Sequence, residues 1–199
     1  MVYFVGAGSG AVDLITVRGA RLLEQADVII YAGSLVNPEL LNYGRKDCRI
    51  LNSAEMTLEE VMEAVMQAER EGKMTVRLHT GDPCLYGAVR EQMDWMDREG
   101  ISYEVCPGVS SFCGAAAALN LEYTLPGVSQ SVVITRMEGR TPVPEKEKIA
   151  SFAAHQSTMV IFLSTGLLRS SPQSLSEGAT GRTRLPPLCT RPHGPMRRR

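Results

Sequence analysis

The sequence has little of what membrane-bound, secreted or metal-binding proteins need. Its apolar runs fall well short of the roughly 20 residues of a membrane-spanning helix, and no charged segment or cleavage site follows Met1. The five cysteines are scattered without a CxxC pair, and the three histidines lie far apart in the sequence. We therefore expect a cytoplasmic protein with reduced thiols, no membrane association, no secretory signal, no disulfide framework and no metal site.

The chain also lacks an excess of charge of one sign. Its formal net charge is −1 and its pI is about 6.3, so no overall basic field favours binding to nucleic acid. Apolar residues make up 44% and charged residues 22% of the 199 residues, which is typical of a globular protein rather than a disordered one. The length predicts one large domain or two small ones.

The C-terminal segment departs from this balance. Residues 165–199 contain seven arginines and one acidic residue, Glu177, a local charge of +6 (7 − 1), together with five of the eleven prolines. They show no helical or alternating apolar period. Composition therefore predicts a basic, disordered extension over residues 169–199.

Strand and helix signals alternate in the rest of the chain. Apolar, β-favouring runs predict strands, and amphipathic stretches predict the helices between them, one of which begins with the capping-box pattern of Thr57 and Glu60. Five strands separated by helices indicate an α/β fold with a mainly parallel sheet. The expected strands are residues 2–5, 28–31, 49–51, 74–79 and 103–106, and the expected helices are residues 17–26, 38–43, 58–72 and 88–98.

The pattern changes after Gly108. A helix of small residues is expected over 113–119, strands over 131–135 and 159–163, and an acid-led helix over 145–154. These elements are the start of a second α/β unit with too little sequence to cover its sheet. We therefore predict an N-terminal domain over 1–108, a partial C-terminal domain over 109–168, and the basic tail over 169–199.

Three unusual loops follow predicted strands, the place where ligands bind in open parallel sheets. The first, Gly6–Ala11, reads G-x-G-x-x-A, like a dinucleotide-binding fingerprint whose glycines allow close backbone approach to a ligand. That fingerprint needs an acidic residue at the end of the second strand, where this chain has Tyr31-Ala32-Gly33. An NAD-dependent oxidoreductase is therefore disfavoured, and a tight turn without a ligand stays an alternative.

The second loop is residues 79–87 and the third is residues 107–112. Asp82, restricted by the proline after it, can accept hydrogen bonds from a ribose or an amine, or it can form an Asx turn and cap. The third loop offers two serine hydroxyls and backbone amides to a polar or anionic group, or the serines cap the next helix. His79 is interpreted as a packed strand residue rather than a base.

The order and spacing of these motifs resemble one family. Four segments carry the resemblance: the first loop with Asp-Leu-Ile-Thr-Val-Arg-Gly after it, Tyr-Ala-Gly-Ser-Leu-Val at 31–36, Thr-Gly-Asp-Pro at 80–83 and Val-Cys-Pro-Gly-Val-Ser-Ser-Phe at 105–112. Together they are similar to the tetrapyrrole (corrin/porphyrin) methyltransferases. Residues 31–36 and 134–142 resemble in particular the members that methylate precorrin-4 at C11. The resemblance is collinear from residue 1 to about residue 168.

The resemblance implies an S-adenosylmethionine-dependent C-methyltransferase of cobalamin biosynthesis that acts on (cobalt-)precorrin-4, a tetrapyrrole. It implies two α/β domains with the cofactor between them, a fold distinct from the usual methyltransferase Rossmann fold, and a homodimer. In the family the first glycine-rich loop lies on the floor of the tetrapyrrole cleft, and its two usual prolines are replaced here by Ser9 and Val12. The residues implied to contact the cofactor are Ser9, Thr80, Gly81, Asp82, Leu85, Ser110, Ser111 and Leu163.

The candidates for substrate contact include four arginines, because the substrate macrocycle bears many carboxylates. Each of these arginines can instead be a solvated surface residue. No catalytic residue is assigned, since the methyl sulfonium is already activated and the protein mainly aligns the reactants and excludes water. The candidates are Gly8, Gly10, Asp13, Arg18, Tyr31, Ser34, Arg77, Arg136 and Arg140.

The tail matches nothing in this family as written. Moving the reading frame one nucleotide upstream over Thr180–Arg198 permits a segment that resembles the missing C-terminal part of the family. We therefore expect a frameshift between about Leu168 and Ala179, and weak or absent activity with exposed sheet edges for a chain that truly ends this way. The alternative is a genuine basic tail for RNA or an acidic partner.

Other functions stay open beside this one. Within the family, a sister enzyme that methylates another ring carbon is the nearest rival, and the sequence does not decide whether the substrate contains cobalt. A truncated relative that binds tetrapyrroles without catalysis is a binding-module alternative.

Overall fold

A five-stranded sheet forms the core of the first of two units in the computed structural model, which describes residues 1–33, 35–139 and 141–164. The described residues group into compact units on either side of the Ala115–Ala116 bond. All strand pairs of the large sheet are parallel, and their order is β3-β2-β4-β1-β5. The strands are β1 (Val2–Gly6), β2 (Val28–Tyr31), β3 (Arg49–Asn52), β4 (Thr75–His79) and β5 (Tyr103–Cys106).

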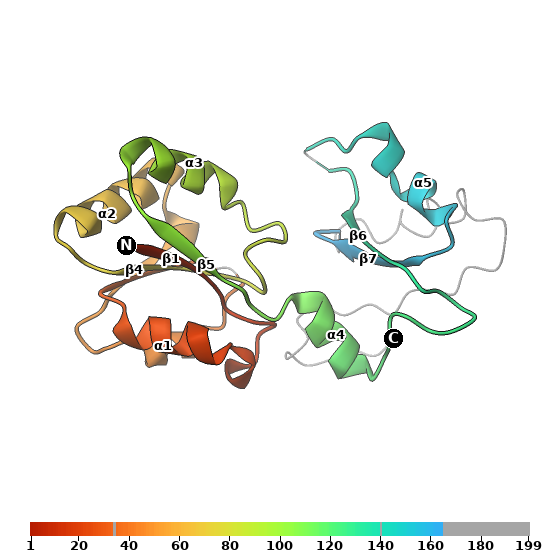
Figure 1. Cartoon of the computed structure of the whole chain (residues 1–199), viewed down its shortest axis with the longest axis horizontal. Coiled ribbons are helices and arrows are strands. Elements are labelled where there is room, and N and C mark those ends of the chain that lie inside the picture. The colour runs from red at the N-terminus through yellow and green to blue at the C-terminus, as the bar shows by residue number, and fades with distance from the viewer. Residues whose placement is uncertain (34, 140, 165–199) are drawn as a thin grey trace. The chain divides into compact units, whose positions relative to one another are not determined.

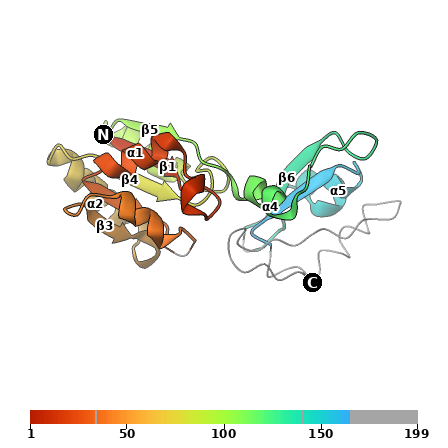
Figure 2. The ribbon, with the colours of Figure 1, turned by 90° about the horizontal axis from the view of Figure 1, so that it is seen from below.

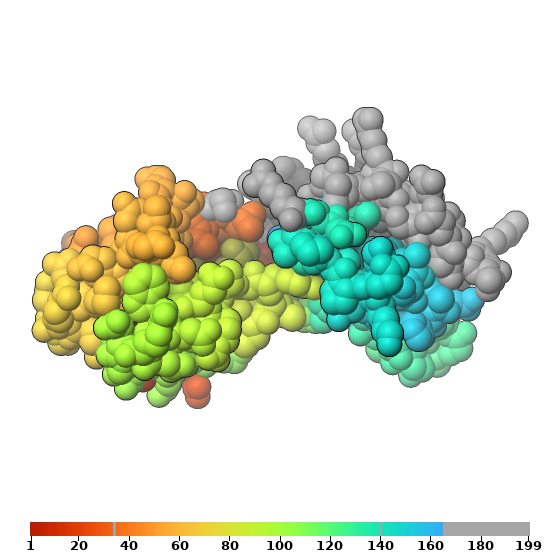
Figure 3. Space-filling view, turned by 90° about the horizontal axis from the view of Figure 1, so that it is seen from above, coloured from red at the N-terminus to blue at the C-terminus, as the bar shows by residue number. Residues whose placement is uncertain are grey.

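Helices cover both faces of this sheet, so residues of its inner strands are buried on both sides. Strands β1 and β2 are almost entirely apolar, whereas the central strand β4 buries the polar side chains of Thr75, Arg77 and His79. In Figure 1, α2 and α3 lie above the sheet and α1 lies below it, and Figure 2 shows α1 from below. The space-filling view from above shows α2 and α3 side by side (Figure 3). The helices are α1 (Val17–Gln25), α2 (Leu58–Arg70) and α3 (Arg90–Glu99), with 3-10 helices η1 (Val12–Leu14), η2 (Pro38–Tyr43) and η3 (Ser53–Glu55).

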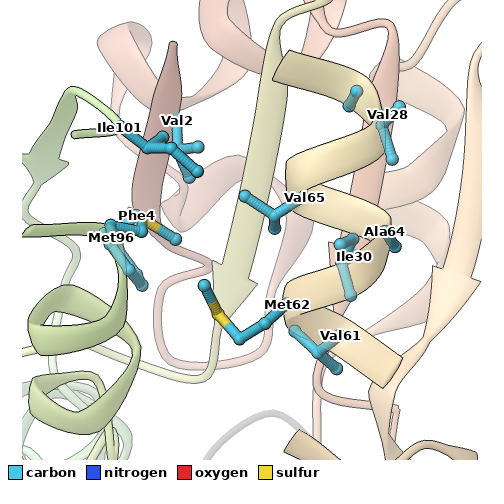
Figure 4. Packing of buried hydrophobic residues seen from close by; sticks show 11 residues of the cluster. Val2, Phe4, Val28, Ile30, Val61, Met62, Ala64, Val65, Met96 and Ile101 are labelled. Carbon is cyan, nitrogen blue, oxygen red and sulfur yellow. The ribbon is translucent and has the colours of Figure 1, made fainter. Parts of the chain in front are cut away.

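The core is divided by the sheet into two layers. Successive strand residues point to opposite faces, so Ile30 packs with Met62 of α2 on one side, while Ile29 packs with Leu23 of α1 on the other. Figure 4 shows the first layer, in which residues of α2 point toward Phe4 and its neighbours on the strands. Burial of these large side chains is the main stabilising term of the unit.

The second unit contains a two-stranded parallel sheet. Its strands are β6 (Val132–Arg136) and β7 (Thr158–Phe162), and its helices are η4 (Glu145–Glu147) and α5 (Ile149–Ala153). Ile149 and Ala153 of α5 are buried against Met159 and Ile161 of β7. The remaining helix, α4 (Ser111–Leu119), begins in the first unit and ends in the second.

The expected elements are found with local differences. The capping box is present, since the Thr57 hydroxyl accepts from Glu60 N and the Glu60 carboxylate accepts from Thr57 N. The expected helix 145–154 is wrong as one element, because Lys148 is extended (φ −61°, ψ 148°) and separates η4 from α5. The helix expected from Ala88 begins at Arg90, because Ala88 has a positive φ of 50°.

The domain division predicted at residues 1–108 and 109–168 stays a prediction, and the basic tail 169–199 lies outside the described residues, as does the segment of the expected frameshift. None of the helices that the structure describes is long and apolar enough to cross a membrane. Over the same residues, no group of three His, Cys, Asp or Glu side chains is arranged to hold a metal ion.

Candidate active site at the carboxyl edge of the sheet

The three unusual loops leave neighbouring strands at the same edge of the sheet. Strand β1 lies between β4 and β5, with Gly6 in register with His79 on one side and Val5 in register with Cys106 on the other. Because the strands are parallel, their carboxyl ends coincide, so the loops that follow are brought together. This edge is where an open α/β sheet holds a ligand.

The loops touch one another backbone to backbone. A Cβ added to Gly6 would lie 2.5 Å from the Cα of Gly108 and 2.5 Å from the carbonyl oxygen of Gly81. A Cβ added to Gly108 would lie 2.1 Å from the same Gly81 oxygen. No side chain fits at Gly6 or Gly108 without a backbone shift, so the packing requires glycine at these two positions. At Gly81, whose carbonyl oxygen they approach, the positive φ of +61° favours glycine instead. We call these three residues the glycine junction.

Hydrogen bonds fix the first loop onto the second. Ala7 N donates to the His79 carbonyl (2.7 Å), and Gly8 and Gly81 exchange two backbone bonds of 3.2 and 3.0 Å. Gly8 and Gly81 adopt φ values of +78° and +61°, and Gly10 adopts +122°, conformations that other residues rarely take. The glycines of the motif are therefore used for backbone shape as well as for close approach.

Asp82 joins the second loop to the third. Its Oδ1 accepts from Cys84 N (2.8 Å), which makes the Asx turn, and its Oδ2 accepts from Gly108 N (3.0 Å) across 26 residues of sequence. The structure thus shows the Asx turn that was the alternative to a ligand contact for Asp82. The contact of Asp82 with a cofactor stays a prediction. The Asp82 carboxylate therefore links the second loop to Gly108 of the glycine junction.

His79 is a neutral, buried residue beneath the second loop. Its side chain is 5% exposed, and burial together with the Arg77 charge lowers its pKa from 6.5 to about 3. The imidazole donates to the Gly87 carbonyl, while its Nε2 has no partner among the described residues. His79 therefore packs and tethers a loop, in agreement with its interpretation from the sequence, and cannot act as a base exposed to a ligand.

The charges around the three loops are few and negative. Residues 6–14, 80–89 and 107–113 contain no lysine or arginine, and their charged side chains are Asp13 and Asp82. A cationic group placed among these loops meets no like charge from them, whereas an anionic one meets two carboxylates. These three loop segments therefore place no positive charge of their own beside a cationic group.

Comparison with known proteins identifies this arrangement. Residues 1–184 match the family of Tetrapyrrole (Corrin/Porphyrin) Methylases. The chain belongs to this family. The family resemblance and the α/β fold class predicted from the sequence are thereby confirmed.

Relatives of this tetrapyrrole methylase carry more specific names. This chain is 54% identical over 177 residues to a protein of Methanocaldococcus jannaschii named cobalt-precorrin-4 C(11)-methyltransferase. The aligned region covers 89% of this chain and 68% of that relative. An X-ray structure of a cobalt precorrin-4 methyltransferase is 47% identical with a TM-score of 0.86, over 90% of this chain and 75% of that one. The chain spans about two thirds of the length of the curated relatives it matches.

A more distant relative of known structure has a small molecule bound. It is the uroporphyrin-III C-methyl transferase of Thermus thermophilus complexed with S-adenyl homocysteine. It is 27% identical to this tetrapyrrole methylase, with a TM-score of 0.73 over 92% of this chain and 77% of that one.

The structure brings most of the predicted cofactor residues of this tetrapyrrole methylase together in the first unit. Ser9 and Ser110 are buried, and Ser110 O accepts from Cys113 N (3.0 Å) and Gly114 N (3.3 Å) at the start of α4. Leu163 lies in the second unit directly after β7, with a positive φ of 55° and 70% exposure. The half-buried members of the set at the carboxyl edge are Thr80, Asp82, Leu85 and Ser111.

The predicted substrate arginines have different surroundings. Arg18 is exposed on α1, whereas Arg77 is 4% exposed inside the first unit, bonded to Gln92 Oε1 (2.8 Å) and to the Ile30 carbonyl (2.9 Å). Burial lowers the pKa of Arg77 to about 10, and these bonds turn it inward, which disfavours contact with a substrate carboxylate.

Other substrate candidates lie on the loops or in the second unit. The half-buried Tyr31 ends β2, and its carbonyl accepts from Ser53 Oγ (3.0 Å). The Arg136 guanidinium donates to the carbonyls of Thr141 and Pro142 (3.0 Å each). Asp13 is exposed on η1, Gly8 and Gly10 belong to the first loop, and Ser34 and Arg140 lie outside the described residues.

Sequence reasoning missed the asparagine that connects the first loop to the segment after β2. Asn37 Nδ2 donates to the Gly10 carbonyl (2.9 Å), and Asn37 Oδ1 accepts from Glu39 N (3.0 Å) at the start of η2. The Asn-Pro pair at 37–38 was the available signal, because it marks a cap or turn. The bond to Gly10 left no signal, since it joins residues 27 apart.

Proposed function

We propose that this protein is an S-adenosylmethionine-dependent methyltransferase that methylates (cobalt-)precorrin-4 at C11 in cobalamin biosynthesis. The observation that carries the proposal is the glycine junction, where loops of β1, β4 and β5 meet at the carboxyl edge with no basic side chain among them. The choice of substrate and ring carbon is supported by the names of relatives at 54% and 49% identity.

S-adenosylmethionine, when bound, supplies a methyl group already activated by a positively charged sulfur. The protein residues then have a limited task, which is to hold two reactants in line and to keep water away. The fixed backbone of the three loops provides a rigid surface, and the carboxylates of Asp13 and Asp82 favour a cation nearby. The residues of the first unit proposed to hold the cofactor are Ser9, Thr80, Gly81, Asp82, Leu85, Ser110 and Ser111. The cofactor contact expected for Leu163 of the second unit stays a prediction.

The tetrapyrrole is proposed to lie against the first loop. Gly8 and Gly10 present backbone without side chains, which suits a flat macrocycle, and Arg18 on the neighbouring helix offers an exposed guanidinium to its carboxylates. Arg77 is left out of this proposal, because its guanidinium is engaged inside the first unit.

A nicotinamide dehydrogenase is disfavoured by two features of the first unit. Strand β2 pairs with β3 and β4 rather than with β1, unlike the order of a dinucleotide-binding sheet. Asp27 lies before β2, at the opposite end from the glycine loops, and is bonded to Arg45 (2.7 Å) and to Met74 N (2.8 Å). No acidic residue is therefore placed to bind a ribose after β2 in the described residues.

The test is methyl transfer by the purified protein, produced from DNA sequenced across codons 160–199, because a frameshifted tail is itself expected to weaken the activity. Enzymatically prepared cobalt-precorrin-4 and metal-free precorrin-4 are each incubated with S-adenosylmethionine carrying a ¹³C methyl group, and the product is analysed by NMR. The proposal expects one labelled methyl group on C11 of at least one of the two substrates. A label on another ring carbon supports a sister enzyme, and tight binding of NAD without binding of S-adenosylhomocysteine overturns the proposal.

Three further properties belong to the same proposal. A homodimer and a cytoplasmic location are supported by the family resemblance, and the domain division after residue 108 by the change of pattern there. Light scattering coupled to size-exclusion chromatography tests the dimer, with a monomer at micromolar concentration as the contrary result. Sequencing of the DNA across codons 160–199 tests the expected frameshift.

A further inference from the structure

We propose that Asn37 is a positioning residue for methyl transfer, because its side-chain amide fixes the first glycine loop in the shape that the substrate meets. The proposal rests on the proposed function for its catalytic half. It concerns a residue on the segment after β2, outside the three glycine-rich loops.

The oxygen and the nitrogen of the Asn37 side-chain amide bind different parts of the chain. Oδ1 accepts from Glu39 N (3.0 Å) and thereby caps η2, while Nδ2 donates to the Gly10 carbonyl (2.9 Å). The cap is local, whereas the Gly10 bond is long-range. A single substitution can therefore remove the hydrogen bond to Gly10 and keep the cap of η2.

The bond to Gly10 links two strands that are not neighbours. Strand β4 lies between β1 and β2 in the sheet, so these two strands are roughly 10 Å apart at two strand spacings. Asn37 belongs to the connection after β2 and Gly10 to the connection after β1. Their bond thus joins the connections on either side of the end of β4, from which the Gly81-Asp82 loop departs.

The first loop needs such support because of its composition. Gly10 adopts a φ of +122° and Gly8 one of +78°, and glycines lose more conformational freedom on ordering than other residues. The bonds of Ala7 and Gly8 to the β4 loop hold the first half of the loop. The bond from Asn37 holds its second half.

Asn37 is itself well anchored. The residue before it, Val36, is 5% exposed, and Leu40 within η2 is fully buried in the core layer below. The segment that carries the Asn37 amide is therefore held by the hydrophobic core. Through its bond to Gly10, it restrains the first loop against that core.

The test uses Asn37→Asp, which has nearly the same shape. Aspartate is an equally good cap for η2, but it has no amide hydrogen to donate and its oxygen faces the Gly10 carbonyl. Asn37→Ser is the second variant, since serine also caps but is too short to reach Gly10. Thr57→Asp is the matched control, because it places a new carboxylate at the cap of α2.

Two measurements separate the loop from the reaction. Hydrogen–deuterium exchange followed by mass spectrometry is expected to show about three- to tenfold faster exchange of the amides around residues 8–14 in both Asn37 variants. Steady-state methyl transfer is expected to lose about ten- to hundredfold in kcat/KM for the tetrapyrrole, with a smaller change in KM for S-adenosylmethionine, because Ser9 is the one proposed cofactor residue in this loop. Thr57→Asp is expected to match the wild type in both.

Each outcome decides a different point. Unchanged exchange in both Asn37 variants overturns the inference, and faster exchange with unchanged kinetics overturns its catalytic half. An equal loss in the Thr57→Asp control attributes the effect to added charge and also overturns it. A wild-type protein that transfers no methyl group overturns the proposed function and the catalytic half together, while the exchange experiment still decides whether Asn37 fixes the loop.

Discussion

Replacing Asp82 by alanine removes two hydrogen bonds that hold the second loop to itself and to the third. The bond from Gly108 N is partly buried and involves a charged acceptor, so its loss is expected to cost about 1.5–3 kcal/mol. The bond from Cys84 N is exposed and is expected to contribute about 0.5–1 kcal/mol. The free energy of unfolding should therefore fall by about 2–4 kcal/mol, of which the contact with Gly108 is the larger part.

The assay is urea unfolding followed by far-ultraviolet circular dichroism. With a slope of about 2 kcal/mol per molar urea, the expected loss lowers the midpoint by about 1–2 M without changing the slope. Asp82→Asn is the matched control, because it keeps one acceptor oxygen and the size of the side chain. Its midpoint should lie between those of the wild type and the alanine variant.

A midpoint for Asp82→Ala within about 0.2 M of the wild type would refute this reasoning. If that variant also binds S-adenosylhomocysteine more weakly in calorimetry, the carboxylate contacts the cofactor directly. If both the midpoint and the affinity fall, comparison with Asp82→Asn separates the two effects, because loss of charge weakens contact with the ammonium group of S-adenosylhomocysteine while one backbone bond survives.

Gly108→Ala should lower the free energy of unfolding by about 3 kcal/mol in urea titration, because its Cβ would lie 2.1 Å from the Gly81 carbonyl oxygen. Gly139→Ala should be nearly neutral, since no atom of the described residues lies within 4 Å of the added Cβ. The His79 pKa of about 3 in the folded state lies below its ordinary 6.5, so between these values the unfolded chain binds a proton that the folded chain does not. Stability should therefore fall as the pH falls from 6.5 toward 3, by at most about 1.4 kcal/mol per pH unit from this group, and the pH slope of the urea midpoint should be smaller in His79→Asn. Thr57→Ala should cost about 1 kcal/mol in thermal unfolding, because it removes the cap of α2.

Each of these three predictions has a contrary result. Equal stability of the Gly108→Ala and Gly139→Ala variants would mean that the glycine junction yields to an extra methyl group. An unchanged pH slope in His79→Asn would show that another group titrates. A Thr57→Ala variant as stable as the wild type would mean that water satisfies the first turn of α2.

The local elements were predictable because they depend on neighbours in the sequence. The apolar run Val28–Tyr31 became a strand, and the Thr57–Glu60 pattern became a capping box. The order of the strands was not predictable, since it depends on pairing between β1 and β4 over some 73 positions of sequence (75 − 2). The burial of Arg77 was missed for the same reason, because Gln92 and the Ile30 carbonyl approach it from other elements.

The candidate site was predictable as a set of loops but not as a set of contacts. Glycine-rich turns after strands indicated the carboxyl edge correctly, because parallel strands end together there. The sequence could not distinguish an aspartate that contacts a ligand from one that joins two loops, since both have the same pattern. Asp82 accepts from two backbone amides, and only their positions in space reveal it.

The central place of β1 in the sheet affects how the chain is made. Strand β1 is the first to leave the ribosome, yet both of its partners, β4 and β5, are completed only at His79 and Cys106. Until His79 has been added, the apolar strand β1 has no partner, and until Cys106 has been added it has a partner on one side only. Closing such long loops slows folding. We expect chains halted before Cys106 to depend on chaperones and to be sensitive to protease, and the five strands to become resistant together once β5 has emerged.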